Sequence, residues 1–234
     1  MIILPARNEA PRVAAVVREI RLQMPGVAVV VVENDSVDDT AAVARAAGAV
    51  VLRSGPGYAR ALRTGFIHAL RSGAPWIVQM DADGQHPARS LPVLLDALAR
   101  ADLVVGSRFV DGAGYPVPVS RLTGIHVLGA WASMWSGQRL RDVTSGYRAW
   151  RPDAVAAMVA DYPEDVADAN VLVRAIRRGL TVEEVAVPMR QRTSGVSMHG
   201  GPASVLFAAR MALLTAREGL VLARPAGYRR TSMK

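Results

Sequence analysis

The chain has 234 residues, contains no cysteine and carries a formal net charge of +8. This length fits one large α/β domain with a small appendage, and a hydrophobic fraction of 51% supplies a sizeable core. The lack of cysteine excludes disulfides, thiolate metal sites and a cysteine nucleophile. No apolar run reaches the roughly 18 residues that a membrane span requires. A positive balance suits phosphate groups, polyanions or an anionic membrane surface.

The basic residues are scattered along the chain, apart from a C-terminal group formed by Arg224, Arg229, Arg230 and Lys234. There is no zinc-finger spacing and no aromatic signature of RNA binding, so we expect no nucleic-acid partner. The opening Met1-Ile2-Ile3-Leu4 has the pattern of a core strand and not of an export signal. The expected location is therefore the cytoplasm or the inner face of the cell membrane.

The first half of the chain alternates strand-like with helix-like segments. We expect strands at 2–4, 27–32, 50–52, 76–80 and 103–106, and helices at 11–23, 38–48, 59–72 and 91–101. The valine run of the second strand is typical of a parallel strand buried on both faces. The alternation predicts a mostly parallel sheet covered by helices, with ligands bound at the carboxyl ends of the strands.

The second half is more varied. We expect a loop at 109–118, an apolar helix at 121–135, a polar turn or a turn into a short strand at 142–151, a helix at 168–178 and a strand at 182–187. Trp131 and Trp135 of the apolar helix belong either to the core or to an interface between chains. The last helix, 202–222, is amphipathic: it either packs on the domain or lies on a membrane with the basic tail on the headgroups.

The most informative segment is Asp81-Ala82-Asp83-Gly84-Gln85-His86-Pro87, which follows an expected strand. Its alternate carboxylates, with an amide oxygen two residues further on, are able to approach one hard cation together. Mg²⁺ and Mn²⁺ are commonly held by one or two carboxylates plus substrate phosphates. A solvated turn with an aspartate cap is the simpler alternative. Asp38 and Asp39, after the second strand, are interpreted as helix caps.

An ordered set of motifs resembles family-2 glycosyltransferases over residues 1–201. The segments that carry the resemblance are Pro5-Ala6-Arg7-Asn8-Glu9, Glu33-Asn34-Asp35-Ser36, Gly57-Tyr58-Ala59-Arg60-Ala61-Leu62-Arg63-Thr64-Gly65-Phe66, the segment from Asp81 to Pro87, Val105-Gly106-Ser107-Arg108-Phe109, Asp142-Val143-Thr144-Ser145-Gly146-Tyr147-Arg148, Glu184-Val185-Ala186-Val187-Pro188 and Arg192-Thr193-Ser194-Gly195-Val196-Ser197. The later motifs are most similar to the branch that makes polyprenyl-phosphate sugars, the dolichol-phosphate mannose synthase-like transferases.

The resemblance implies an α/β chain with the A-type glycosyltransferase fold. This is a single Rossmann-like domain with a mostly parallel central sheet flanked by helices, followed here by the C-terminal amphipathic helix. Residues 1–201 would form the catalytic domain, with a nucleotide-sugar-binding half at 1–108 and an acceptor-binding half at 109–201. Residues 202–234 would form the helix and the basic tail.

The resemblance also implies roles for individual residues. Asp81, Asp83 and Gln85 would hold Mg²⁺ or Mn²⁺, and Asp83, Arg148 and Asp168 are the candidate catalytic residues. The nucleotide-diphosphate sugar would be bound by Pro5, Ala6, Arg7, Glu9, Glu33, Asp35, Gly57, Arg60, Asp81, Ala82, Asp83 and Gln85. The acceptor or its phosphate would be bound by Arg108, Arg121, Ser145, Arg148, Arg192 and Ser197.

The chain departs from the family pattern in places. Glu33 and Asn34 replace a common pair of aspartates, and Tyr58 and Met198 stand where lysine is frequent. The candidates for a carboxylate base are Asp165 and Asp168, although Asn170 falls nearest to the usual acid. A base is worth about 10²–10⁴-fold when a hydroxyl attacks. A phosphate monoester attacks without one, so the weak match favours a lipid-phosphate acceptor.

The expected activity is metal-dependent, inverting transfer of a hexose, mannose or glucose, from a GDP- or UDP-sugar to an acceptor, preferably a polyprenyl phosphate. Peripheral membrane contact or a membrane partner protein would give access to that lipid. A soluble transferase acting on a hydroxyl of a small metabolite is the alternative. A sugar nucleotidyltransferase would carry a Gly-rich phosphate loop after the first strand, which is missing. A non-catalytic binding domain would be expected to have lost Asp81 or Asp83.

Overall fold

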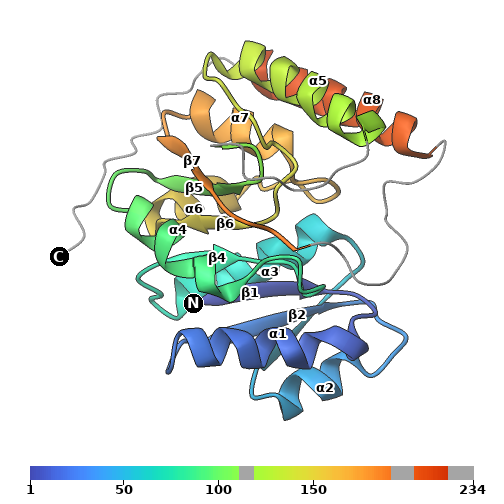
Figure 1. The fold of residues 1–234 in the computed structure, drawn as a ribbon, viewed down its shortest axis with the longest axis vertical. Coiled ribbons are helices and arrows are strands. Elements are labelled where there is room, and N and C mark those ends of the chain that lie inside the picture. Colours follow the sequence, from blue (N-terminus) through green and yellow to red (C-terminus); the bar gives the residue numbers. More distant parts are fainter. Residues whose placement is uncertain (111–118, 191–202, 221–234) are drawn as a thin grey trace.

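A computed structural model describes residues 1–110, 119–190 and 203–220. Its centre is a sheet of seven strands in the order β3-β2-β1-β4-β6-β5-β7 (Figure 1). The strands are β1 (Ile2–Ala6), β2 (Val29–Asn34), β3 (Val50–Ser54), β4 (Ile77–Gln79), β5 (Leu103–Ser107), β6 (Arg148–Trp150) and β7 (Val182–Ala186). Neighbouring strands are parallel, except that β6 runs antiparallel to both β4 and β5.

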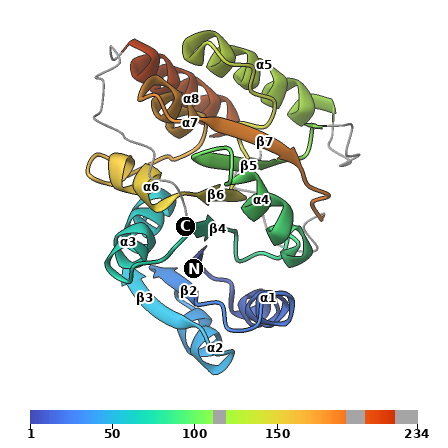
Figure 2. The ribbon, with the colours of Figure 1, turned by 90° about the vertical axis from the view of Figure 1, so that its left-hand side faces the viewer.

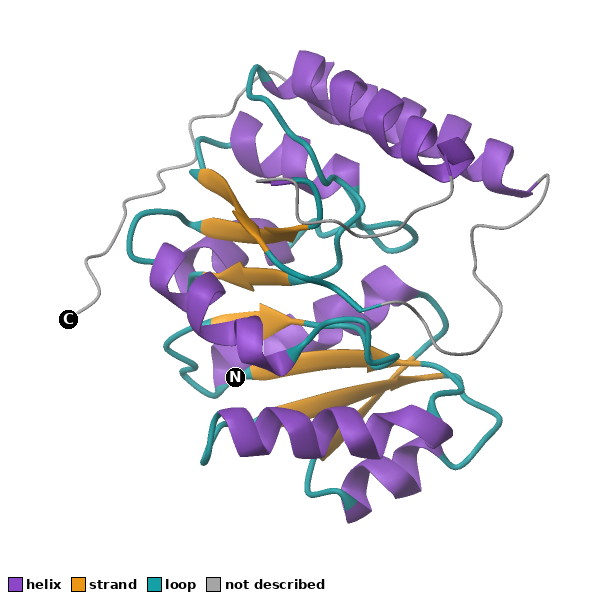
Figure 3. Cartoon of the chain, viewed as in Figure 1, coloured by secondary structure: helices purple, strands orange, loops and turns teal. Residues whose placement is uncertain are grey.

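Helices cover both faces of this sheet (Figures 2 and 3). They are α1 (Ala10–Gln23), α2 (Thr40–Ala46), α3 (Tyr58–Arg71), α4 (Leu91–Ala97), α5 (Val119–Ser136), α6 (Pro152–Val159), α7 (Ala169–Arg177) and α8 (Ala203–Leu220), with a short 3₁₀ turn at Ala88–Ser90. Because the side chains of a strand alternate between its two faces, the buried strands place side chains in two separate hydrophobic cores, one on each face of the sheet.

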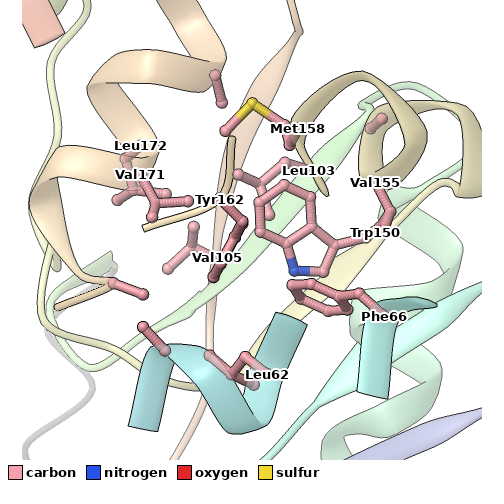
Figure 4. Close-up of a cluster of buried hydrophobic side chains, with 14 of the residues drawn as sticks. Leu62, Phe66, Leu103, Val105, Trp150, Val155, Met158, Tyr162, Val171 and Leu172 are labelled. Carbon is pink, nitrogen blue, oxygen red and sulfur yellow. The ribbon is translucent and has the colours of Figure 1, made fainter. Parts of the chain in front are cut away.

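One core lies between the sheet and α1, α2 and α4, where Leu4 of β1 meets Val13 of α1 and Leu91 of α4. The other lies under α3, α6 and α7 and contains the largest buried aromatic side chains. Figure 4 shows its centre, where the rings of Phe66 and Trp150 pack edge to face with centroids 5.7 Å apart. Aromatic pairs of this geometry add stability beyond the area they bury. These cores hold the strand ends, and therefore the loops that follow them, in fixed positions.

The C-terminal helix α8 packs on the domain beside α5 and α7 (Figure 1). The guanidinium Nε of Arg174 on α7 donates to a carboxylate oxygen of Glu218 at 2.7 Å, and Met211 is fully buried. Trp131 of α5 donates from its indole to the carbonyl of Ala212 at 2.9 Å. Within the described residues, α8 is thus a packed helix. None of the described helices combines the length and the apolar character needed to cross a membrane.

The strand and helix alternation expected for residues 1–108 is confirmed, with boundaries shifted by a few residues. The turn at 142–151 does lead into a short strand, β6, which enters the sheet in the opposite direction to its neighbours. The helix α6 was not expected, although Pro152 in its first turn is a typical helix start. The expected loop at 109–118 and the basic tail lie mostly or wholly outside the described residues.

Candidate active site

The predicted motifs meet at one edge of the sheet. The parallel strands β1, β2, β4 and β5 end there, and the antiparallel strand β6 begins there. Arg148, the first residue of β6, pairs in register with Gln79 of β4 and with Val105 of β5. Ligands of open α/β sheets bind at the carboxyl ends of the strands, so the fold places the candidate residues where a ligand site is expected.

The loops after β1 and β2 are joined by reciprocal hydrogen bonds. The backbone N–H of Asn8 donates to Ser36 Oγ at 3.1 Å, and the N–H of Val37 donates to Asn8 Oδ1 at 2.9 Å. Asn8 and Asp35 have φ angles of 56° and 57°, a left-handed conformation that asparagine and aspartate tolerate better than most residues. These two loops therefore form one preorganised wall beside the loop of residues 81–87, which follows the neighbouring strand β4.

The capping interpretation is confirmed for Asp38. Its carboxylate accepts from the N–H of Ala10 at 3.1 Å and from the N–H of Thr40 at 3.0 Å, so it serves the first residues of both α1 and α2. Hydrogen bonding holds the pKa of Asp38 below its ordinary value, against the opposing effect of burial, which is the largest single contribution. Asp39 precedes α2 but makes no side-chain capping bond to it.

The residues expected to bind the nucleotide line this wall, and most already have protein contacts. Pro5 and Ala6 are buried, while Arg7 is exposed with a guanidinium nitrogen 3.9 Å from Asp35. Glu9 pairs with Arg12 at 2.6 Å. The Glu33 carboxylate accepts from the backbone N–H of Ser36 and lies 3.7 Å from the guanidinium of Arg53. Gly57 has a φ of 121° and packs near the carbonyl of Glu164. Arg60 pairs with the Glu164 carboxylate at 3.3 Å.

The Asp81 carboxylate is bordered by two different parts of the chain. Tyr58 of α3 donates its hydroxyl to Asp81 Oδ1 at 2.9 Å. A Cβ atom at Gly146 would lie 3.0 Å from both carboxylate oxygens, so only glycine leaves room at that position. Burial and the negative charges of Asp81 and Asp168 raise the pKa of Tyr58 well above its ordinary value, which keeps its hydroxyl a donor.

His86 supports Asp81 from within the same loop. The backbone N–H of Asp81 donates to His86 Nδ1 at 3.0 Å, and His86 Nε2 lies 3.7 Å from Asp81 Oδ2. The imidazole is buried and stacks on Tyr147, with ring centroids 4.9 Å apart. Since Nδ1 accepts a hydrogen bond, the neutral ring carries its proton on Nε2, the nitrogen that faces the carboxylate.

Asp83 and Gln85 occupy the turn that follows, where Gly84 has a φ of +83°. Asp83 Oδ1 accepts from the N–H of Gln85 at 3.0 Å. The backbone N–H of Arg190 donates to the carbonyl of Gln85 at 2.9 Å, and Gln85 Nε2 donates to the carbonyl of Arg190 at 3.3 Å. Arg190 also makes a two-pronged contact with Glu19 of α1, at 2.7 and 2.9 Å. The loop is therefore fastened to both α1 and the segment after β7.

Arg148 and Asp168 form the floor of the site. The Arg148 side chain is fully buried, and its Nη2 donates to the carbonyls of Val143 and Asp168, each at 3.3 Å. Burial raises the pKa of Asp168 to about 6; the Arg148 guanidinium opposes this shift and the Asp81 carboxylate adds to it. Perturbed carboxylates of this kind are candidates for proton transfer. Arg148 acts as an interior cation beneath the site, and its proposed contact with phosphate stays a prediction.

The other base candidates have different environments. Asp165 is exposed and pairs with Arg210 at 2.8 Å. Asn170 is buried, and its side chain makes local hydrogen bonds. It accepts from the N–H of Asp168 and donates to the carbonyl of Val166, each at 2.9 Å. The Asp168 carboxylate interacts electrostatically with that of Asp81. Its assignment as a base stays a prediction.

Two residues expected to bind the acceptor are engaged inside the protein. Arg108 makes a buried two-pronged contact with Asp142, at 2.8 and 2.6 Å, and also donates to Thr144 at 2.7 Å. Ser145 donates its hydroxyl to the carbonyl of Gly106 at 2.6 Å. These contacts shape the turn before β6. Arg192 and Ser197 lie outside the described residues, and Arg121 lies in α5 where its side chain is not described.

The donor atoms of the loop fit a hard divalent cation. Asp81 and Asp83 supply carboxylate oxygens and Gln85 is an amide, a set suited to Mg²⁺ or Mn²⁺ when substrate phosphates complete the coordination. Within the described part of the chain, no group of three or more histidine, aspartate, glutamate or cysteine side chains is arranged to bind a metal alone. A metal bound at Asp81 and Asp83 would take its further ligands from outside this pair of carboxylates.

Sequence reasoning missed several supporting residues. Tyr58 was noted only as a departure from lysine, and His86 and Gly146 were part of motifs without an assigned role. Glu19 and Arg190 gave no signal, because they lie 171 positions apart in the chain and meet only in the fold. Gly146 gave no signal either, because only the fold shows that it lies against the Asp81 carboxylate.

Comparison with known proteins shows the family of the chain. Residues 1–141 match the family described as glycosyl transferase family 2, and the chain belongs to that family. It is 32% identical to polyprenol monophosphomannose synthase of Mycolicibacterium smegmatis over 214 residues, which cover 86% of this chain and 81% of the relative. It is 34% identical to undecaprenyl-phosphate mannosyltransferase of Micrococcus luteus over 212 residues, covering 85% and 87%. The protein is therefore a glycosyltransferase.

A solved structure supports the fold. Glucosyl-3-phosphoglycerate synthase from Mycobacterium tuberculosis, in complex with Mn²⁺, UDP and phosphoglyceric acid, superposes with a TM-score of 0.71 at 17% identity. The match covers 95% of this chain and 79% of that structure. The likeness confirms the expected A-type glycosyltransferase fold.

Proposed function

We propose that the protein transfers a hexose from a nucleoside diphosphate sugar to a polyprenyl phosphate, with inversion at the anomeric carbon. An oxygen of the acceptor phosphate forms a bond to the anomeric carbon while the bond from that carbon to the diphosphate oxygen breaks. The nucleoside diphosphate leaves with the bonding electron pair. Because both bonds change in one displacement, the acceptor attacks from the face opposite the leaving group.

The observation that carries the donor half of this proposal is the enclosure of Asp81 next to Asp83 at the sheet edge. Tyr58 and Gly146 fix the Asp81 carboxylate, and Gln85 is tied in place through Arg190. Asp81, Asp83 and Gln85 would hold Mg²⁺ or Mn²⁺, which would neutralise charge that develops on the leaving diphosphate. The wall formed by the loops after β1 and β2 would take the base and ribose, with Glu33 facing them.

The lipid-phosphate acceptor is supported by the relatives, whose names specify polyprenol and undecaprenyl phosphate. The weak sequence match of the base candidates supports it less, because the Asp168 carboxylate interacts electrostatically with Asp81 and is available as a base. Asp168 would instead accept a proton from the acceptor, since a carboxyl with a pKa of about 6 exchanges protons near neutral pH. A phosphate monoester, whose second pKa is also about 6, would need this help only in part.

A hydroxyl acceptor is the second candidate, and Asp168 is the observation that favours it. The solved structure of similar fold is named as a synthase that acts on phosphoglycerate, a small metabolite. Asp168→Asn separates the two. With a hydroxyl acceptor the variant should lose about 10²–10⁴-fold in kcat, the usual contribution of a general base. With an acceptor that is already anionic, the loss should stay below about tenfold.

The donor site is tested by calorimetric titration of GDP- and UDP-sugars with and without Mn²⁺. We expect metal-dependent binding of one nucleotide, lost in Asp83→Asn. Asp96→Asn is the matched control, because Asp96 is an exposed aspartate on α4, away from the sheet edge. The absence of binding by any donor, with or without the metal, would contradict the proposal.

A further inference from the structure

An open groove of about 840 Å³ lies between α5 and the chain that follows it. One wall is the face of α5 that carries His126, Ala130 and Met134, and the other includes the segment 137–141. This volume is within the range of small-molecule sites, about 300–1,000 Å³. From His126 to Met134 the wall extends about 12 Å at the rise of an α-helix.

The groove begins at the edge of the candidate active site. Phe109, which lines it, has its ring centroid 5.7 Å from that of His126 at one end of the α5 wall. Phe109 directly follows Arg108, and Arg108 contacts Thr144 at 2.7 Å. Two residues after Thr144, Gly146 lies against the Asp81 carboxylate. Phe109, two residues after the end of β5, thus lies at the same edge of the sheet as the candidate active site.

The lining combines an apolar surface with positive charge. Phe109, Ala130, Met134 and Leu140 supply the apolar part, and Arg139 and Arg141 supply the charge. None of the lining residues that the structure describes is acidic. His126, Ser133, Gly137 and Gln138 complete the lining. A ligand with an apolar body and an anionic end fits this combination of apolar and basic side chains.

We infer that this groove binds the acceptor's isoprenoid tail beyond the first isoprene units that follow the phosphate. The inference rests on the proposed lipid-phosphate acceptor and states where the tail of that lipid would bind. With the phosphate at the sheet edge, the tail passes Phe109 and continues along the Ala130 and Met134 face of α5. Arg139 and Arg141 border this path, where they can attract the anionic headgroups of the membrane that carries the lipid.

Chain length of the acceptor tests this path. Met134→Lys places a charge on the apolar wall, and the transfer reaction is measured with undecaprenyl phosphate and with short geranyl phosphate, both in detergent. We expect KM for undecaprenyl phosphate to rise about tenfold, the effect of losing one apolar side-chain contact. KM for geranyl phosphate and the affinity for the donor should stay unchanged. Ala130→Lys, on the same wall, should reproduce the result.

Leu213→Lys is the matched control. Leu213 is 72% exposed, compared with 63% for Met134, but it lies on α8 and does not line the groove. An equal rise of KM in the Leu213 variant, or a rise in the Met134 variant that is the same for both acceptors, would overturn the inference. If the wild-type protein transfers sugar to neither phosphate, the proposed function itself fails, and this result is distinct from a loss of chain-length dependence.

Discussion

The hydroxyl of Tyr58 donates a 2.9 Å hydrogen bond to the carboxylate of Asp81, joining the start of α3 to the end of β4. The same carboxylate borders Gly146 in the turn before β6. A carboxylate held from two sides keeps its orientation before any substrate arrives. Preorganisation of this kind stabilises charge in the transition state without reorganisation during the reaction.

Removal of the Tyr58 hydroxyl should weaken donor binding. Tyr58→Phe deletes a hydrogen bond to a charged group, a contact worth about 1.5–3 kcal/mol, part of which water at the half-buried carboxylate would replace. We expect the metal-dependent affinity for the nucleotide to fall about three- to tenfold in calorimetry. Tyr162→Phe is the control: the buried Tyr162 hydroxyl has no hydrogen-bond partner among the described atoms, so its loss should leave the affinity unchanged.

A methyl group at residue 146 should displace the Asp81 carboxylate. In Gly146→Ala the new Cβ would lie 2.9 Å from the Tyr58 hydroxyl and 3.0 Å from the carboxylate oxygens, closer than packed atoms accept. We expect transfer activity to fall at least about tenfold, since small displacements at a reacting centre are costly. Gly124→Ala, where nothing lies within 4 Å of the added Cβ, should retain full activity. Equal activity of the two variants would contradict the enclosure of Asp81.

The buried imidazole of His86 should act as a positioning residue for Asp81. His86→Ala removes the acceptor of the Asp81 N–H and the ring stacked on Tyr147. We expect weaker Mn²⁺-dependent nucleotide binding, about tenfold, because an unpaired buried N–H carries a penalty of about 1–3 kcal/mol. His86→Asn should recover part of the lost nucleotide affinity, since the asparagine side-chain oxygen can accept the Asp81 N–H in place of Nδ1. A purely structural role would instead lower the melting temperatures of both variants without this difference in affinity.

The stability of the fold should depend on pH through Asp168. Burial raises its pKa to about 6, from the ordinary value of 3.8. The folded state therefore binds the proton more tightly than the unfolded chain, and stability rises as the pH falls from about 6 to about 4. Above this window the ionised carboxylate destabilises the fold, so Asp168→Asn should melt at a higher temperature than the wild type near neutral pH. The difference in melting temperature between the variant and the wild type should decrease toward about pH 4.

Asp165→Asn serves as the control for that measurement. Asp165 is three residues away, but it is exposed and paired with Arg210 at 2.8 Å. Its replacement should not raise the melting temperature near neutral pH. A stabilisation of the same size in both variants would indicate a general effect of lowering negative charge.

Much of the fold was predictable from local patterns. The valine run of β2 and the apolar run before Asp81 both predicted buried parallel strands, and both lie in the sheet. The strand β6 was harder to predict, because it is short and begins with the fully buried Arg148. The carbonyls that bind its guanidinium come from residues 143, 167 and 168. No local pattern shows that a cation will find such partners.

The site was predictable in composition but not in detail. The spacing of Asp81 and Asp83 correctly indicated the loop at the sheet edge, because alternation of strands and helices fixes where strand ends meet. Spacing alone placed Asn170 nearest to the usual acid of the family, whereas in the fold the Asn170 side chain accepts from the backbone N–H of Asp168, and the Asp168 carboxylate interacts electrostatically with Asp81. Ser145 illustrates the same limit, since its hydroxyl bonds to the carbonyl of Gly106, 39 positions away.

The central claim is sugar transfer to a polyprenyl phosphate, and one assay tests it directly. Purified protein with Mn²⁺ is given labelled GDP-mannose or UDP-glucose together with undecaprenyl phosphate, and separately with 3-phosphoglycerate. We predict label in an organic-extractable sugar phosphate with one donor, dependent on the metal and lost in Asp83→Asn. Label that appears only in a water-soluble product with 3-phosphoglycerate would contradict it and establish the small-metabolite acceptor.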